Sequence, residues 1–177
     1  MVSQRMLTSR IPTDWRDLQE SVAAVLRECG FSVEVEKVID TARGAVEIDV
    51  FAEEHIHGRR YVVLCECKHW TARVPQNVIH GFRTVVGDSG ANMGYIVSMA
   101  GFQSGAMTAA ELTNIQLVTW EQFQEAFEAT WLEHHLIPTI TERLDDLFDC
   151  TEPLLPNRFL SLDAARQEAL QRTESEA

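Results

Sequence analysis

Two stretches, Gly44-Ala-Val-Glu-Ile-Asp-Val50 and Arg60-Tyr-Val-Val-Leu-Cys-Glu-Cys-Lys68, decide the fold expected for this chain. Both alternate apolar with polar residues over much of their length, which predicts strands over 45–52 and 60–68. Residues 53–59 between them are charged or contain His and Gly, and they predict a hairpin turn. The two strands are therefore expected to be antiparallel neighbours.

Alternation also predicts which side chains share a face of the sheet. In the first strand the apolar side chains are expected to face one way: Val46, Ile48 and Val50. Glu47 and Asp49 are then expected to face the other way. In the second strand Glu66 and Lys68 follow Val62 and Leu64 on one face, so this face is expected to lie under a helix. Asp49 is expected to meet Glu66 and Lys68 across the ladder.

The rest of the chain predicts further helices and strands around this pair. Helices are expected over 12–29, 74–86, 103–113 and 120–131, and strands over 31–39, 93–99 and 115–118. A three-strand meander followed by alternating helices and strands favours an α/β fold with a central mixed sheet of about five strands, parallel in its second half. Residues 138–149 and 161–172 predict two acidic amphipathic helices. We therefore expect a domain over 1–135 and an acidic helical C-terminal extension over 136–177.

Composition favours a folded, cytoplasmic protein with no membrane partner. The chain has 177 residues, of which 45% are hydrophobic. It shows neither the apolar core of a signal peptide nor the ~20 apolar residues of a membrane span. The net charge of −12 opposes DNA binding, but it is uneven. Residues 1–90 carry 11 Lys/Arg and 13 Asp/Glu, whereas residues 91–177 carry 4 and 14. The excess acid therefore lies away from Asp49, Glu66 and Lys68.

The four cysteines favour free thiols. Cys65 and Cys67 alternate with charged residues, so their sulfur atoms are expected on the buried face. A zinc site of Cys65, Cys67, His55 and His57 is the alternative, although Cys-x-Cys is not the usual zinc-binding spacing.

Two carboxylates and an amine on a covered strand face predict chemistry. Asp49 and Glu66 aimed at one point would form a site for a hard cation, and Mg²⁺ prefers few protein carboxylates together with water and phosphate oxygens. Lys68 could then hold or activate an attacking water and offset charge on a phosphate. The alternative is a structural ion pair.

Asp49 followed by Glu66-Cys67-Lys68 resembles the D-(x)n-E-x-K signature of the PD-(D/E)xK nuclease superfamily, and especially the Mrr-like catalytic domain of type IV restriction endonucleases. The resemblance covers about residues 12–125, with Ile48 in place of the superfamily's proline. It includes the Gly94-Tyr-Ile-Val-Ser98 strand and the Gly101-Phe102 segment. It implies a restriction-endonuclease-like three-layer fold, with Asp49 and Glu66 as ligands of Mg²⁺ or Mn²⁺ and Lys68 as the water-activating residue.

Seven further residues are considered around this centre. Glu20 matches the helix acid that often completes such a site, and an exposed helix carboxylate is the alternative. Gln76 fits a polar helix position near the site in related domains, or merely decorates the start of its helix. The candidate phosphate contacts are His69, Arg73, His80 and Arg83, with a solvated helix face as the competing interpretation. Trp70 could stack on nucleic acid, although packing is the usual role of a tryptophan.

The expected function is Mg²⁺-dependent hydrolysis of DNA phosphodiester bonds, in restriction or phage defence. Duplex cleavage requires two cuts, so the resemblance implies a homodimer or a separate DNA-recognition subunit. About 12 residues precede the part of the chain that carries the resemblance, too few for a separate DNA-reading domain. Specificity is therefore expected to come from a partner, from residues 136–177, or from neither. The alternatives are a structure-selective nuclease of the junction-resolvase type, and a non-catalytic module whose acidic helices dock a partner in a defence complex.

Overall fold

The computed structural model describes residues 7–151, 162–163 and 166–167. The chain divides into two compact units, residues 1–134 and 135–177, and each is described by itself. The helices and strands of the first unit follow one another in this order: α1 (Trp15–Glu28), β1 (Ser32–Thr41), β2 (Gly44–Ile56), β3 (Arg59–Lys68), α2 (Gln76–Ser89), β4 (Met93–Ser98), α3 (Ser104–Ala110), β5 (Ile115–Thr119) and α4 (Trp120–Trp131).

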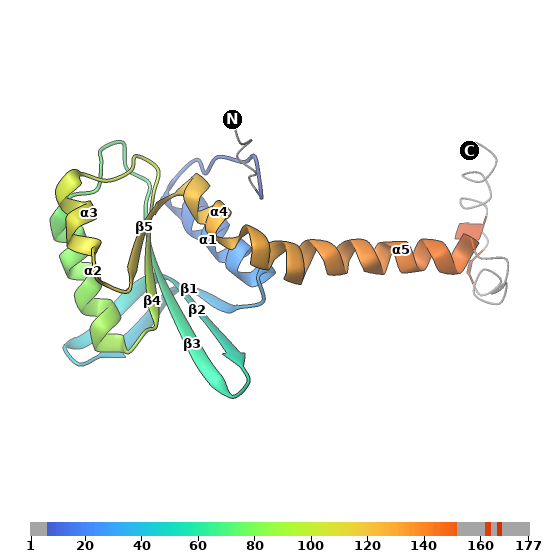
Figure 1. Ribbon diagram of the computed structural model, residues 1–177, viewed down its shortest axis with the longest axis horizontal. Coiled ribbons are helices and arrows are strands. Elements are labelled where there is room, and N and C mark those ends of the chain that lie inside the picture. Colours follow the sequence, from blue (N-terminus) through green and yellow to red (C-terminus); the bar gives the residue numbers. More distant parts are fainter. Residues whose placement is uncertain (1–6, 152–161, 164–165, 168–177) are drawn as a thin grey trace. The chain divides into compact units, whose positions relative to one another are not determined.

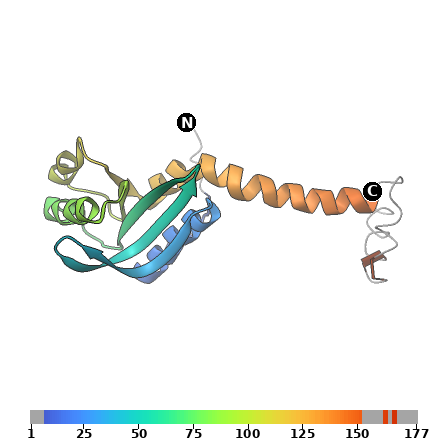
Figure 2. The ribbon, with the colours of Figure 1, turned by 90° about the horizontal axis from the view of Figure 1, so that it is seen from below.

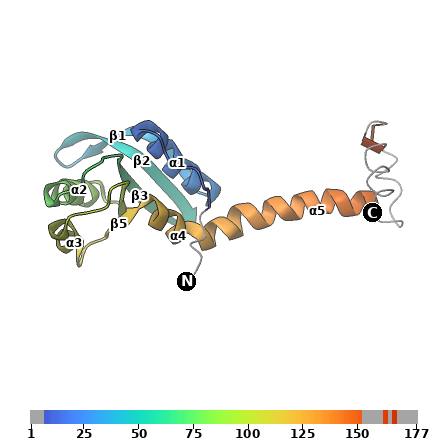
Figure 3. The ribbon, with the colours of Figure 1, turned by 90° about the horizontal axis from the view of Figure 1, so that it is seen from above.

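The five strands form one mixed sheet in the order β1-β2-β3-β4-β5. The first three strands pair antiparallel, and β3, β4 and β5 pair parallel. Helices α1 and α4 cover one face of the sheet, and α2 and α3 cover the other (Figures 1 and 3). The view from below shows the sheet between the two helix layers (Figure 2). The expected three-layer α/β architecture and the parallel second half are confirmed.

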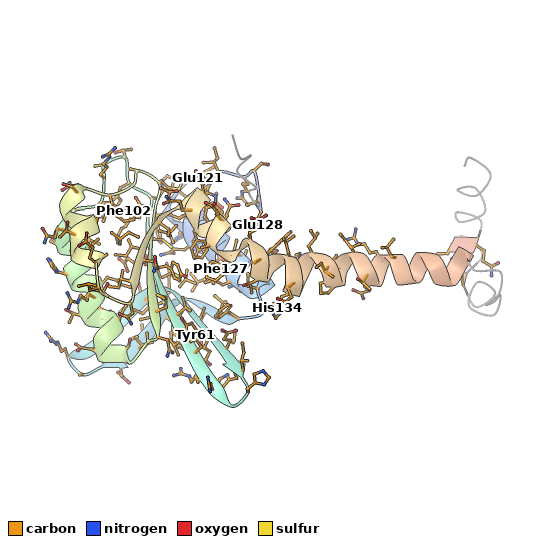
Figure 4. All side chains as sticks on the ribbon, in the orientation of Figure 1. Tyr61, Phe102, Glu121, Phe127, Glu128 and His134 are labelled. Carbon is orange, nitrogen blue, oxygen red and sulfur yellow. The ribbon has the colours of Figure 1, made fainter. Side chains whose placement is uncertain are left out.

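Each face of the sheet has its own hydrophobic core. The α1/α4 core contains the large side chains of α4, among them Trp120, Phe123 and Phe127, packed on strand residues such as Val63 and Cys65. Figure 4 shows Phe127 on α4 directed toward the sheet. The α2/α3 core packs Ile79, Phe82 and Val86 of α2 on residues of the strands' other face. Burial of these two surfaces is the main favourable contribution to folding.

Helix α1 begins three residues inside its predicted range of 12–29 and ends one residue before the end of that range. The side chain of Asp14 accepts a hydrogen bond from the Asp17 amide at 2.8 Å, which satisfies one of the free amides of the first turn. At the other end Gly30 has φ +95°, a conformation that favours glycine and turns the chain into β1. Between these ends the helix buries residues at helical spacing, including Leu18, Val22 and Leu26.

The hairpin between β2 and β3 is longer than expected. Residues 53–59 were predicted to be a turn, but β2 continues to Ile56 and β3 starts at Arg59. Only His57 and Gly58 form the turn, and both have positive φ (50° and 77°). A two-residue turn of this kind matches the twist of antiparallel strands, so pairing can continue to its edge. An ion pair between Arg60 and Glu53, with N···O 2.6 Å, bridges the extended ladder.

Helix α2 is shifted from its predicted range of 74–86. It begins at Gln76, with Pro75 as its N-cap, and ends at Ser89 before Gly90. Val74 instead forms an isolated β-bridge with Phe102, so it cannot belong to the helix.

Beyond α4 the chain continues through a π-helical segment, Leu132–Leu136, into α5 (Ile137–Thr151). The first expected C-terminal helix is thus present. The second, over 161–172, falls almost entirely outside the described residues. In α5, Ile137, Ile140 and Leu144 are exposed. No helix in the described part of the chain is long and apolar enough to cross a membrane.

Candidate active site

Asp49 lies where β2 changes the way its side chains face. Ile48 packs in the α2/α3 core, whereas Val50, two residues later, packs in the α1/α4 core. A regular strand would place both on one face. The expectation that Val46, Ile48 and Val50 share a face is therefore wrong, and the alternation is interrupted at Asp49.

The neighbouring strand β1 has a matching irregularity. The register pairs Val35 with Val50 and Lys37 with Ile48, and between these pairs stands Glu36 with φ +53°. Val35 packs against the α1/α4 core. Lys37 places its ammonium 3.8 Å from the ring centroid of Phe51, a member of the α2/α3 core. In both strands, therefore, the side chains change from one face of the sheet to the other at the same position along the ladder, which is the position of Asp49.

The carboxylate of Asp49 takes the place of a backbone hydrogen-bond acceptor at the point where the β2–β3 ladder ends. The β2–β3 register ends at the pair Val50–Cys65, so the strands separate beyond it. Asp49 Oδ2 accepts a hydrogen bond from the amide of Cys67 at 2.7 Å. A bond from an amide to a carboxylate is stronger than a neutral one. This contact fixes Asp49 against the end of β3 as the sequence predicts.

Glu66 and Lys68 lie on the face of β3 that α2 covers. Val62 and Leu64 precede them on that face and are buried in the α2/α3 core. Lys68 Nζ forms an ion pair with Glu66 Oε1, and the two side chains are only 18% and 23% exposed. Burial raises the pKa of Glu66, the nearby charge of Asp49 raises that pKa further, and Lys68 opposes both effects.

The two carboxylates fit a hard cation. They lie close enough for Asp49 to raise the pKa of Glu66, and Lys68 balances only one of the two charges. No described residue donates a hydrogen bond to Asp49 Oδ1 or Glu66 Oε2. Within the described part of the chain, no group of three or more His, Cys, Asp or Glu side chains could hold a metal. Two carboxylates nevertheless suffice for Mg²⁺, which keeps water in several positions.

The cysteines lie on the opposite side of the sheet from Glu66. Cys65 and Cys67 are free thiols buried in the α1/α4 core, and burial raises the pKa of both. His55 and His57 are exposed on the β2–β3 hairpin. The buried free thiols are confirmed, and the zinc alternative has no such cluster among the described residues.

A pocket adjoins Glu66 and Lys68 on the α2 side of the sheet. Its volume is about 340 Å³, and Glu66 and Lys68 line it together with Glu47 and Trp70. Trp70 is 43% exposed, and its ring centroid lies 5.3 Å from Lys68 Nζ. The sequence did not reveal this pocket. Its one visible sign was Gly81, an unexplained glycine within the predicted helix.

Glu20 stays a prediction. Its carboxylate is exposed and lies 3.7 Å from Arg27 on the same helix. It lines a different pocket, together with Arg10 and Asp17. Helix α1 packs on the face of the sheet that carries Cys65, whereas Glu66 and Lys68 are on the other.

The candidate phosphate contacts divide into two groups. Gln76 and His80 lie one turn apart on the exposed side of α2, 3.0 Å between Nε2 atoms, and Arg73 and Arg83 are exposed nearby in the sequence. His69 is different, because its Nε2 lies 3.1 Å from the carbonyl oxygen of Pro12 and the contact is partly buried. Its ring therefore ties the segment before α1 to the end of β3.

Comparison with known proteins supports the same architecture. A restriction endonuclease family, that of the Mrr catalytic domain, matches residues 12–127. No curated protein is significantly similar to the chain. The solved structure of AF1548, a protein of unknown function, is 20% identical, with a TM-score of 0.53 over 89% of this chain and 94% of that one. VC1899 from Vibrio cholerae is 14% identical, with a TM-score of 0.50 over 67% of this chain and 33% of that one. The chain thus spans about a third of VC1899, and both likenesses show the fold.

Proposed function

Because the chain belongs to the restriction endonuclease family of Mrr catalytic domains, we propose that it is a Mg²⁺-dependent endonuclease that hydrolyses phosphodiester bonds of DNA. One observation carries the proposal: Asp49, Glu66 and Lys68 gather where β2 and β3 separate, on partly buried positions beside an open pocket. A structural ion pair would need Lys68 and one acid only. The second carboxylate makes the site an acidic one that a cation would complete.

Asp49 and Glu66 would hold the ion, Mg²⁺ or Mn²⁺. When bound, such an ion polarises the phosphate and lowers the pKa of an attacking water. The protein's part is to keep two carboxylate oxygens available. It does so by engaging Asp49 Oδ2 with the Cys67 amide and Glu66 Oε1 with Lys68.

Lys68 would act on the phosphate side of the site. Glu66 and the ring of Trp70 hold its ammonium at the mouth of the pocket. From there Nζ can donate hydrogen bonds to the attacking water and to the phosphate oxygen that gains charge in the transition state. The low exposure of the pair strengthens this interaction, because less water screens it.

Substrate and partners follow from the charge distribution. His80, Arg73 and Arg83 would contact phosphates along exposed positions of α2 and the loop before it. These residues are few for a chain of net charge −12. We therefore propose that a second copy or a separate DNA-recognition subunit supplies further contacts, in a cytoplasmic restriction or phage-defence system.

The test is cleavage of supercoiled plasmid by the purified chain with Mg²⁺ or Mn²⁺. Wild type should nick or linearise the plasmid, and Lys68→Ala and Asp49→Asn should lose at least a hundredfold in rate, the typical contribution of a positioned catalytic group. Lys37→Ala is the matched control, because Lys37 is also partly buried, ion-paired and close to an aromatic ring. It should cut at the wild-type rate.

Two results would contradict the proposal. Equal cutting by Lys68→Ala and wild type would identify a contaminating nuclease. An inert wild type that also binds no divalent metal, with or without candidate partners, would favour the non-catalytic docking module instead.

A further inference from the structure

The pocket beside Glu66 and Lys68 is larger and more apolar than phosphate hydrolysis requires. Its floor and walls are aliphatic and aromatic side chains from β2 and α2: Val46, Ile48, Val78, Phe82 and Val85. At about 340 Å³ it falls in the size range of pockets for small organic groups. A site that handled only phosphate and metal would not need such an apolar wall.

Gly81 keeps this pocket open. It lines the pocket from within α2, where a glycine destabilises the helix relative to alanine. A Cβ built at Gly81 meets no atom within 4 Å, so neighbouring packing does not demand glycine there. The missing side chain leaves empty volume in the pocket that Glu66 and Lys68 also line.

The charges around the pocket select against an anion. Glu47 and Glu66 contribute two carboxylates, and the one ammonium, Lys68, is already paired. A phosphate inside the pocket, beyond the ammonium at its mouth, would find no other cation among the lining side chains, whereas a flat uncharged ring could lie against the apolar wall. Trp70, which lines the same pocket and is 43% exposed, offers a face for stacking. Carboxylates at the edge can accept hydrogen bonds from an exocyclic amino group.

We propose that this pocket receives one unstacked nucleobase from the strand being cut, adjacent to the scissile phosphate, and prefers bases that carry an amino group. The inference rests on the proposed function, because it takes the strand at Glu66 and Lys68 to be nucleic acid. Unpairing a base has a free-energy cost that is smallest where the base is mismatched or single-stranded. DNA with an unpaired nucleotide near the cut therefore binds more tightly than a perfect duplex.

The test measures binding rather than cleavage. Two 30-mer duplexes are compared in Ca²⁺ without Mg²⁺, one fully paired and one with a single unpaired 2-aminopurine, which is a fluorescent amino-bearing base. Wild type should bind the second duplex at least tenfold more tightly, and stacking on Trp70 should change the fluorescence of the probe.

Two pairs of variants isolate the pocket. Gly81→Leu should fill it and abolish the tenfold preference, while Gly87→Leu should keep the preference. Gly87 lies on the same helix, is equally open to a new Cβ and does not line the pocket. Trp70→Ala should also lose the preference, whereas Trp15→Ala, which removes a similarly exposed tryptophan under an arginine, should keep it. The Trp70 pair decides the matter if Gly81→Leu fails to fold.

The outcomes separate this inference from the proposed function. A wild type that cuts plasmid but shows no preference for the unpaired base overturns the base pocket alone. So does a preference that survives in both Gly81→Leu and Trp70→Ala. A wild type that neither cuts plasmid nor binds either duplex overturns the proposed function, and the base pocket falls with it.

Discussion

Replacing Asp49 with asparagine should stabilise the metal-free protein while abolishing its activity. Asparagine has nearly the same shape, and its Oδ1 can still accept the Cys67 amide, which bonds to Asp49 at 2.7 Å. The change removes one negative charge next to Glu66, a carboxylate whose pKa is raised by burial and by Asp49. Functional sites commonly sacrifice stability in this way.

The size of the effect is the difference of two opposing contributions. One charge shifts the pKa of another over roughly 4–6 Å, and at the far end of that range like charges repel by roughly 2–3 kcal/mol at an effective dielectric constant of 20. Replacing a hydrogen bond to a charged acceptor by a neutral one costs about 1 kcal/mol. Lys68 already screens part of the repulsion, so the net gain expected for Asp49→Asn is about 1 kcal/mol. For a chain of this size that raises Tm by about 2–4 °C.

With a divalent metal bound, wild type should be more stable than Asp49→Asn, the reverse of the order expected without metal. At a Mg²⁺ concentration one hundred times its Kd, a protein that binds one ion is stabilised by about 2.7 kcal/mol. Wild type should gain this stability, and Asp49→Asn should gain little because it has lost a ligand and a charge. Thermal unfolding followed by circular dichroism, once in EDTA and once in Mg²⁺, measures both effects on the same samples.

Asp40→Asn provides the matched control, because Asp40 is an exposed carboxylate on β1 paired with Ala45 rather than with the site. It should change Tm little in either buffer. A lower Tm for Asp49→Asn than for wild type in EDTA would refute the idea that the two acids repel each other. An equal rise of Tm with Mg²⁺ in both proteins would refute Asp49 as a ligand.

Three further predictions concern the scaffold. Gly94→Ala should destabilise by about 1–3 kcal/mol in urea unfolding, because its Cβ would come within 2.8 Å of two side chains of α2; an unchanged midpoint would mean that α2 shifts freely. Glu36→Gly should raise the free energy of unfolding by about 0.5–1 kcal/mol, because glycine adopts a positive φ without strain. Glu34→Gly, in extended backbone, should lower it. A similar loss of stability in both variants would contradict the strain at position 36. In a Cys150→Ser protein the remaining thiols are buried, and burial raises the pKa of Cys67 and of the other two. None of them should therefore react with Ellman's reagent at pH 8 before the protein unfolds. Rapid reaction of one thiol would show that one of the two hydrophobic cores opens in the folded protein.

The fold was predictable because its main signals are periodic. Alternation marks the antiparallel strands, and helical spacing of apolar residues marks α1. The boundaries were less predictable where a tight turn competes with composition. Polar residues 53–55 suggest a loop, yet a two-residue turn at His57 and Gly58 lets the β2–β3 ladder extend through them. Polar composition indicates that a segment can be exposed to solvent, whereas the geometry of the turn determines where strand pairing ends.

The sequence predicted where Asp49, Glu66 and Lys68 lie in the sheet, but it did not predict the pocket beside them. The pairing of Asp49 with the end of β3 follows from the antiparallel order, and the burial of Glu66 and Lys68 follows from Val62 and Leu64 before them. The pocket could not be foreseen, because its walls come from β2 and α2 and its opening depends on an absent side chain at Gly81. The sequence shows which side chains are present, but the empty volume between β2 and α2 depends on how these two elements pack.

The interruption at Asp49 explains why this acid differs from the others on its strand. In a regular strand the side chain of Asp49 would point to the face opposite to Ile48 and Val50, and the β2–β3 ladder would continue past it. Here Ile48 and Val50 pack into opposite cores, and Glu36 with φ +53° allows β1 to follow the same reversal. The reversal ends the β2–β3 pairing at Val50, which leaves the Cys67 amide for the carboxylate. The irregular backbone therefore both creates the donor that orients Asp49 and separates the strands, so the site depends on a local departure from the pattern that predicts the fold.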